Sequence, residues 1–287
     1  MIIPVDRLLL IDGSNLLFQM FYGMPSRIVN HEGRPIQGTL GFVGALLKMI
    51  RMTCPTHVAV LFDGEHSNPR KELDAAYKAN RPDFSEIPEE ETPFSQLPDI
   101  FSALRHLEIP FAETENCETD DWMAGYALHY GGERQVIIAS QDSDFFQLIA
   151  KNVFVLRYRG DDSRLCTEQY VRDKFGVSPS RYADLKALVG DTADNIRGIK
   201  GVGPKTAAAL LTEYGSLEGI FENVQGISKK GLRESLTEGA ERLHINASLI
   251  KLTKEVSLPF SLAETVYFEK KLSSREVLGA IGVIKLN

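Results

Sequence analysis

The chain has 287 residues, which is enough for one large domain or two modest ones. Its 43% hydrophobic and 25% charged residues are typical of a globular protein and exclude the disordered and fibrous classes. No apolar run approaches the length of a membrane span, the N-terminus lacks a signal-peptide pattern, and the three cysteines show no pairing motif. We therefore expect a cytoplasmic protein that does not contact a membrane.

Four short apolar runs predict buried strands, at residues 7–11, 57–62, 136–140 and 153–158. Segments of helical period lie between them, at residues 39–52, 94–107 and 120–130. This alternation predicts an α/β fold with a parallel sheet.

Acidic residues follow three of these strands: Asp12, Asp63, and the pair Asp142 and Asp144. Ligands of parallel sheets lie beyond the carboxyl ends of the strands, so we expect these side chains to converge. An aspartate after a strand can instead be a simple helix cap or turn residue. Three such positions in one chain make that alternative weaker.

Between the second and third strands, a basic segment is followed by an acidic one. Arg70, Lys71, Lys78 and Arg81 fall within twelve residues, with Tyr77 among them. Their spacing of three to four favours a helix on which Arg70, Tyr77 and Arg81 share a face. Cations interleaved with an aromatic ring suit single-stranded nucleic acid. The alternative is a solvated surface helix leading into the acidic, proline-spaced loop at residues 83–93.

A cluster of three acids, Glu118, Asp120 and Asp121, begins the next helical segment. Acids at a helix start complement its dipole, so this position alone is weak evidence. Three acids within four residues repel one another, however, and a bound cation would offset that repulsion.

Residues 190–207 combine acids with glycines. Asp191 and Asp194 are three apart, so on a helical turn both carboxylates would point the same way. Gly198, Gly201 and Gly203 follow, and then Pro204 and Lys205 lead into a helix. Glycines allow close backbone approach, and amides at a helix start form an anion site. A nucleotide-triphosphate loop is disfavoured, because Pro204 separates glycine from lysine and no strand precedes the motif.

The whole set of acids comes from five separate segments. Zinc sites need His or Cys clusters, and calcium loops gather their ligands in one segment. Oxygen ligands from many segments favour Mg²⁺ or Mn²⁺, and so many acids exceed the needs of one ion. We therefore expect two ions, an arrangement that cleaves phosphodiesters. The net charge of −7 argues only weakly against a nucleic-acid partner, since bound cations reverse the sign locally.

Taken jointly, these motifs resemble the bacterial 5′-3′ exonuclease, or flap endonuclease, family, found at the front of DNA polymerase I and as stand-alone proteins. The resemblance covers nearly the whole chain, to about Glu255. The matching stretches follow the family's order: LLLIDGSN at 8–15, VLFDG at 60–64, RKELDAAYKANRP at 70–82, ETDD at 118–121, SQDSDFFQL at 140–148 and GDTADNIRGIKGVGPKTA at 190–207.

The resemblance implies metal ligands and a fold. The first ion would be held by Asp12, Asp63, Glu118 and Asp120, with Asp121 close by. The second would involve Asp142, Asp144, Asp191 and Asp194, several of them through water. The implied fold is a PIN-like α/β core at residues 1–170 with a helical arch at about 70–105. A helical DNA-binding domain would follow at 171–287, with a helix-hairpin-helix element at about 190–212.

The resemblance also implies DNA contacts. Residues 70–81 resemble the arch through which a 5′ flap passes, where Arg70, Lys78 and Arg81 would bind DNA and Tyr77 would stack near the displaced base. Lys78 and Arg81 would contact the scissile phosphate. The glycine hairpin resembles an element that grips duplex phosphates and often holds K⁺, through Gly201, Gly203, Lys205 and Thr206. Residues 38–42 resemble the part that meets the duplex at the junction.

Three positions depart from the family's pattern without removing an acid. Gln19 stands where a basic residue is usual, Ser143 replaces a common lysine and Thr119 replaces an alanine. The expected function is a structure-specific 5′ nuclease of replication or repair, a monomer acting on DNA 5′ ends and 5′ flaps and compatible with RNA–DNA hybrids. The alternatives are a catalytically weak DNA-junction binding protein on the same scaffold and an RNA-primer-removing ribonuclease.

Overall fold

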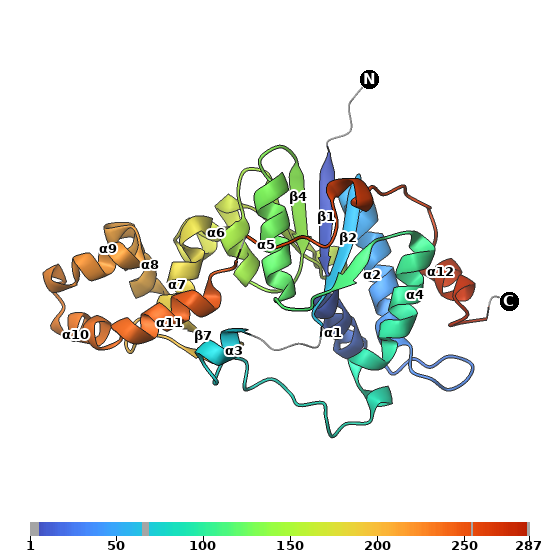
Figure 1. The fold of residues 1–287 in the computed structure, drawn as a ribbon, viewed down its shortest axis with the longest axis horizontal. Helices are drawn as coiled ribbons and strands as arrows, with labels where there is room; N and C mark the ends of the chain where they lie inside the picture. The colour runs from blue at the N-terminus through green and yellow to red at the C-terminus, as the bar shows by residue number, and fades with distance from the viewer. Residues whose placement is uncertain (1–5, 65–68, 254, 286–287) are drawn as a thin grey trace.

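The computed structural model describes residues 6–64, 69–253 and 255–285. Its central sheet has six strands in the order β3-β2-β1-β4-β5-β6 (Figure 1). All pairs are parallel except β5 with β6. The predicted α/β fold is confirmed, and the sequence reading missed only two three-residue edge strands. The strands are β1 (Arg7–Asp12), β2 (His57–Phe62), β3 (Phe111–Glu113), β4 (Gln135–Ala139), β5 (Val153–Arg157) and β6 (Arg164–Cys166).

Both faces of the sheet are covered, which explains the continuous apolar runs of its strands. Leu9 and Ile11 of β1 pack against one helical layer, α1 (Gly13–Gly23), α2 (Gln37–Thr53) and α4 (Leu97–Leu107). Leu8 and Leu10 pack on the opposite face, which α5 (Thr119–Tyr130) covers. All four side chains are fully buried, and each contributes about 2 kcal/mol of hydrophobic stabilisation.

A helical domain extends to one side of the sheet (Figure 1). Its apolar core is continuous with the α5 side of the sheet, so the two parts are packed as one body. The buried Asn246 side chain joins two of its segments by donating to the carbonyls of Ala187 and Arg197, at 2.9 and 2.8 Å. The helices are α6 (Glu168–Phe175), α7 (Tyr182–Val189), α8 (Pro204–Tyr214), α9 (Leu217–Glu222), α10 (Lys230–Glu238) and α11 (Ala240–Ile250).

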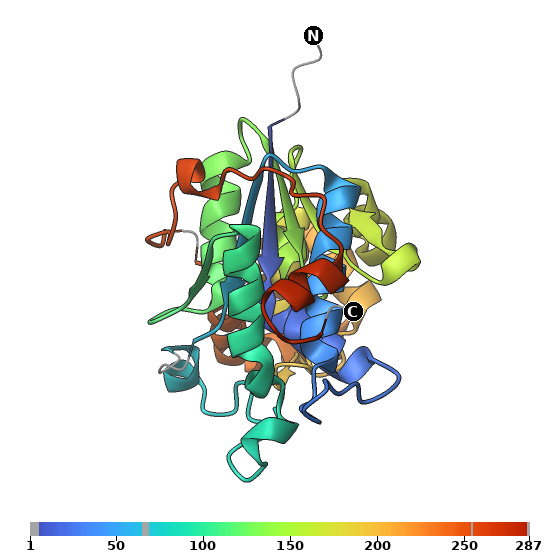
Figure 2. The same ribbon diagram turned by 90° about the vertical axis from the view of Figure 1, so that its right-hand side faces the viewer.

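The C-terminal tail returns to the sheet and does not belong to the helical domain (Figures 1 and 2). The Tyr126 hydroxyl donates to the Phe260 carbonyl at 2.9 Å, and the Tyr267 amide donates to Thr56 at 2.9 Å. Helix α12 (Ser274–Ala280) then packs against α2 and α4. The tail therefore differs from the expected assignment of all of residues 171–287 to a helical domain, whereas a division near residue 170 stays a proposal.

The segment between β2 and α4 is mostly irregular. It contains the short helices α3 (Pro69–Leu73), η1 (Glu89–Glu91) and η2 (Pro93–Gln96). The continuous helix expected through Arg81 is wrong, because the Asp74 side chain accepts from the Ala76 amide at 2.9 Å and starts a turn. Lys78 then adopts a left-handed conformation with φ of 56°. We call residues 69–83 the gateway segment.

No helix in the described part of the chain is long and apolar enough to cross a membrane.

The glycines of the hairpin at residues 198–203 differ in whether a side chain would fit beside them. A Cβ added at Gly198 would lie 2.1 Å from the carbonyl oxygen of Val189, whereas nothing lies within 4 Å of one added at Gly203. Gly198→Ala should therefore lower the free energy of unfolding by about 2–4 kcal/mol, because backbone must shift. Gly203→Ala should cost less than about 1 kcal/mol. Urea denaturation of both variants tests this, and equal losses would contradict it.

Candidate metal centre

Asp12 and Asp63 lie at the ends of the adjacent strands β1 and β2, as the sequence predicts. Asp12 is buried and accepts from the Asn15 amide at 2.9 Å and the Ser140 hydroxyl at 2.7 Å. Burial, and then the charge of Asp63, raises the pKa of Asp12 to about 7. Asp63 accepts from the Thr119 amide at 3.0 Å, which ties it to the start of α5.

The negative charges of Asp120 and Asp142 lie close enough to repel those of Asp12 and Asp63. Burial, followed by the charge of Asp142, raises the pKa of Asp120 well above its ordinary value. Asp142 is held by its own loop, accepting from the Asp144 amide at 2.8 Å. Among the residues that the structure describes, none of Asp12, Asp63, Asp120 and Asp142 has a Lys, Arg or His nitrogen within 4.0 Å. We call these four residues the unpaired acids.

Three further acids form a second group. Carboxylate oxygens of Asp144, Asp191 and Asp194 all lie within 4.8 Å of one another. Asp191 ends the two-residue strand β7 (Gly190–Asp191), which pairs with β8 (Ile196–Arg197), and Asp194 lies in the turn between them. The expected helical turn is therefore wrong, but a tight hairpin brings the two carboxylates together equally well.

Lys186 of α7 is a site residue that the sequence reading missed. Its buried ammonium group makes ion pairs with both Asp144 and Asp191. Burial opposes its charge, but Asp144 and Asp191 outweigh that effect and raise the pKa of Lys186. Burial also raises the pKa of Asp144 to about 7, against the influence of Lys186. The available signal was a lysine within the apolar helical stretch YADLKALV.

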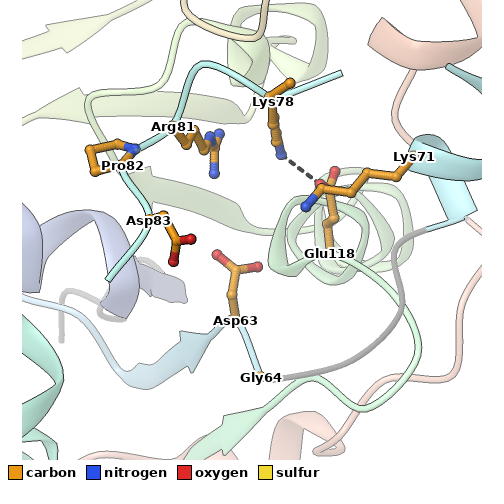
Figure 3. Close-up of a pocket in the computed structure, with 9 residues that line it drawn as sticks. Asp63, Gly64, Lys71, Lys78, Arg81, Pro82, Asp83 and Glu118 are labelled. Carbon is orange, nitrogen blue, oxygen red and sulfur yellow. Dashed lines mark hydrogen bonds and ion pairs between the residues drawn. The ribbon is translucent and has the colours of Figure 1, made fainter. Parts of the chain in front are cut away.

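The gateway segment supplies the cations for the remaining acids. Arg70 makes ion pairs with Glu118 and with Asp121, the latter at 2.8 Å. Lys78 reaches Glu118 at 2.5 Å (Figure 3), and Arg81 reaches Asp194 at 3.0 Å.

Tyr77 is buried, with its hydroxyl 3.3 Å from a carboxylate oxygen of Glu118. Its predicted stacking on a base remains a prediction, and it requires the gateway segment to move.

A cavity of about 440 Å³ lies between the gateway segment and the end of β2 (Figure 3). Its lining mixes cations, from Lys71, Lys78 and Arg81, with carboxylates, from Asp63, Asp83 and Glu118. It therefore offers a phosphate both cationic contacts and neighbouring metal ligands. The residues that line it are Asp63, Gly64, Lys71, Lys78, Ala79, Arg81, Pro82, Asp83 and Glu118.

The donor set fits hard divalent cations. Every candidate ligand is a carboxylate, and most are buried where their charges repel. The group of Asp144, Asp191 and Asp194 could hold one ion. The expected first site at Asp12, Asp63, Glu118 and Asp120 and the expected place of Asp142 at the second ion stay predictions. Glu118 and Asp121 lie beside the unpaired acids but are already paired with the gateway segment.

The glycine hairpin is open to a ligand. Gly201, Gly203 and Lys205 are exposed at the N-terminus of α8, and Thr206 is half-buried. Gly201 has φ of 76°, which favours glycine, and an added Cβ there would meet nothing within 4 Å. The backbone amides can therefore approach an anion closely. The DNA and K⁺ contacts predicted for this hairpin stay proposals.

One departure from the family's pattern, Gln19, has a structural role. Its side chain donates to the Tyr158 carbonyl at 2.8 Å, so it joins α1 to the end of β5. Thr119 binds Asp63 only through its backbone amide, which alanine would also offer, and its buried hydroxyl has no partner among the described residues.

Comparisons with known proteins agree with this geometry. Residues 7–176 match the N-terminal resolvase-like domain of the 5′-3′ exonuclease model, and residues 177–272 match its C-terminal SAM-fold domain. The chain belongs to the 5′-3′ exonuclease family.

Curated relatives of this family member include much longer proteins. It is 37% identical over 265 residues to DNA polymerase I of Rhizobium leguminosarum, covering 90% of this chain and 25% of the relative. The identity to DNA polymerase I of Mycobacterium leprae is 36% over 255 residues, covering 88% and 27%. The chain thus spans about a quarter of these relatives.

Solved structures share the fold of this exonuclease-family chain. The D15 protein of bacteriophage T5, co-crystallised with metal ions, has a TM-score of 0.72 at 23% identity, covering 96% of this chain and 94% of that one. The catalytic core of Rad2 in complex with a DNA substrate has a TM-score of 0.62 at 16% identity, covering 97% and 87%.

Lys186 should compete with an ion for Asp144 and Asp191. In chelator, Lys186→Met should unfold at lower urea concentration, because buried acids lose their counter-charge. In calorimetric titrations with Mn²⁺, the site of lower affinity should bind its ion about tenfold more tightly in Lys186→Met than in the wild type. Lys230→Met, which removes only an exposed pair with Glu234, is the control. Weaker ion binding with unchanged stability would contradict this competition.

The raised pKa of Asp12 predicts the pH dependence of the metal-free protein. The unfolded chain ionises this carboxyl near 3.8 and the folded chain near 7. Stability in chelator should therefore fall as the pH rises from about 4 to about 7. Asp12→Asn removes one such group and should make the curve of urea midpoint against pH less steep, while the raised pKa of Asp144 maintains part of the slope. A curve as steep as that of the wild type would refute this assignment, and Asp162→Asn, at an exposed acid, serves as control.

Proposed function

We propose that this chain is a metal-dependent 5′ nuclease that hydrolyses DNA phosphodiesters at free 5′ ends and at 5′ flaps. The observation that supports this most directly is the group of Asp144, Asp191 and Asp194, whose carboxylate oxygens lie within 4.8 Å of one another. The charge of Asp142 acts both on Asp144 and on Asp12 and Asp120, which places the unpaired acids next to this group. Family membership and the shared fold support the same conclusion. We propose Mg²⁺ or Mn²⁺ as the ions, because hard oxygen ligands from separate segments suit them.

The chain's own residues would divide the work. When bound, the ions supply a water of lowered pKa and neutralise charge on the phosphate. Lys78 and Arg81 would bind the scissile phosphate, which requires them to turn from Glu118 and Asp194 towards the cavity. The exposed hairpin at Gly201 and Gly203 would bind duplex phosphates and would hold a K⁺ ion. These backbone contacts predict little dependence on sequence and a 5′-phosphate product.

Several broader features belong to the same proposal. A role in replication or repair, activity on RNA–DNA hybrids and a monomeric state are consistent with it. A cytoplasmic location is favoured by the three free cysteines.

A second candidate function is a catalytically weak DNA-junction binding protein. Four cations, from Arg70, Lys78, Arg81 and Lys186, already neutralise acids of the candidate site. If ions cannot displace them, the protein would bind a junction without cutting it.

A flap assay separates the two candidates. The wild-type protein should cut a labelled 5′ flap duplex near its junction with Mg²⁺ or Mn²⁺, and chelator should abolish the cutting. Asp120→Ala and Asp194→Ala should each lose more than about 100-fold in rate while retaining DNA affinity. Asp161→Ala, at an acid whose side chain is 97% exposed, should cut normally. Tight binding of the flap without metal-dependent cutting would favour the junction-binding protein.

A further inference from the structure

The gateway segment is fastened to the helical domain by contacts distant in the chain. Arg242 of α11 makes an ion pair with Asp74 at 2.5 Å. The Asn195 side chain donates to the Ala76 carbonyl at 2.8 Å, and that of Asn80 donates to the Thr192 carbonyl at 3.0 Å. The middle of the segment is therefore held by α11 and by the hairpin that carries Asp191 and Asp194.

Asp74 performs two tasks with its two carboxylate oxygens. One accepts from the Ala76 amide and ends helix α3, while the other accepts from Arg242. The side chains of Asp74 and Arg242 are 14% and 33% exposed, so water screens this pair less than an open surface pair. Asp74 thus joins the local turn of the gateway segment to the helical domain.

This attachment determines where the gateway cations lie. Next to the fastened turn, the Lys78 amide donates to the Asp194 carbonyl at 3.0 Å. The side chains of Lys78 and Arg81 then extend over the acids and border the cavity (Figure 3). Helix α3 at the start of the segment contacts α11, and Phe84, just beyond its end, packs against Phe18 of α1. The segment therefore forms a bridge from the helical domain to the α/β core across the acids.

We infer that Asp74 and Arg242 form a clasp that holds the gateway segment over the acids and makes cleavage depend on a free 5′ end. The inference rests on the proposed nuclease function. Beneath a closed bridge, a strand reaches the acids only by passing its end through. With the clasp open, a strand enters from the side, and the end no longer matters. Asp74 and Arg242 are positioning residues, since neither lines the cavity.

Hydrogen exchange of the metal-free full chain tests the clasp without any cleavage. Arg242→Ala and Asp74→Asn should each speed the exchange of amides in residues 74–81 at least about tenfold. Asparagine keeps the acceptor for the Ala76 amide, so Asp74→Asn removes the ion pair without removing the turn. Arg242→Lys, which keeps the charge, should restore much of the protection. Arg172→Ala, which removes an exposed arginine pair of the same domain, is the control.

Cleavage of two flaps tests the consequence. One flap has a free 5′ end, and the other carries a 5′ biotin bound by streptavidin before the enzyme is added. The wild type should strongly prefer the free end. Arg242→Ala and Asp74→Asn should each lower the ratio of the free-flap rate to the blocked-flap rate at least about tenfold, chiefly because they cut the blocked flap faster. Arg242→Lys and Arg172→Ala should keep the wild-type ratio.

Either of two results would overturn the clasp. One is wild-type exchange in both Arg242→Ala and Asp74→Asn, and the other is faster exchange with an unchanged ratio of rates. Failure of the proposed function gives a different result, since the wild type would then cut neither flap with any ion. In that case the exchange measurement still decides whether Asp74 and Arg242 hold the segment.

Discussion

Repulsion among carboxylates is the constraint on which the rest of the structure depends. Nine acids from five segments gather at the carboxyl ends of the strands and at the adjoining β7–β8 hairpin. Burial there raises the pKa of Asp12 and of Asp120. A fold that places so many like charges together must offset them. Two sources of cations do so among the described residues: Lys186 of the helical domain, and Arg70, Lys78 and Arg81 of the gateway segment.

The negative charge is neutralised for some of these acids and not for others, which affects how tightly each group would bind an ion. Asp144 and Asp191 share Lys186, whereas the unpaired acids have no cation within 4.0 Å in the described chain. An ion entering among the unpaired acids displaces no lysine or arginine, although it must displace protons from acids of raised pKa. Above the pH at which these acids ionise, it should be held more tightly than an ion that competes with Lys186. Lys78 and Arg81 are paired with Glu118 and Asp194. In the proposed function, phosphate binding by these cations would therefore be coupled electrostatically to ion binding by the acids.

The sequence predicted the features that follow from hydrophobic periodicity and from the positions at which strands end. The four longer strands and the convergence of Asp12 and Asp63 follow from apolar runs and from the geometry of parallel sheets. It did not predict the gateway turn, because a side-chain bond from Asp74 to a backbone amide overrides the helical spacing of Arg70, Tyr77 and Arg81. The clasp and the acidic partners of Lys186 could not be predicted, because they join residues far apart in the chain, although the apolar stretch around Lys186 indicates that this lysine is buried. Only packing in three dimensions brings such residues together.

The continuous apolar core explains how acids from the α/β core and from the helical domain keep fixed positions relative to one another. Asp144 follows β4, while Asp191 and Asp194 follow α7, and their oxygens still lie within 4.8 Å of one another. Helix α7 is buried along nearly its whole length, and Asn246 ties its end and the β8 turn to α11. The same helix α11 carries Arg242, so one element positions both the second group of acids and the bridge above it. A shift of α11 would therefore move these acids and the gateway segment together, so the helical domain would help to set the geometry of the proposed active site.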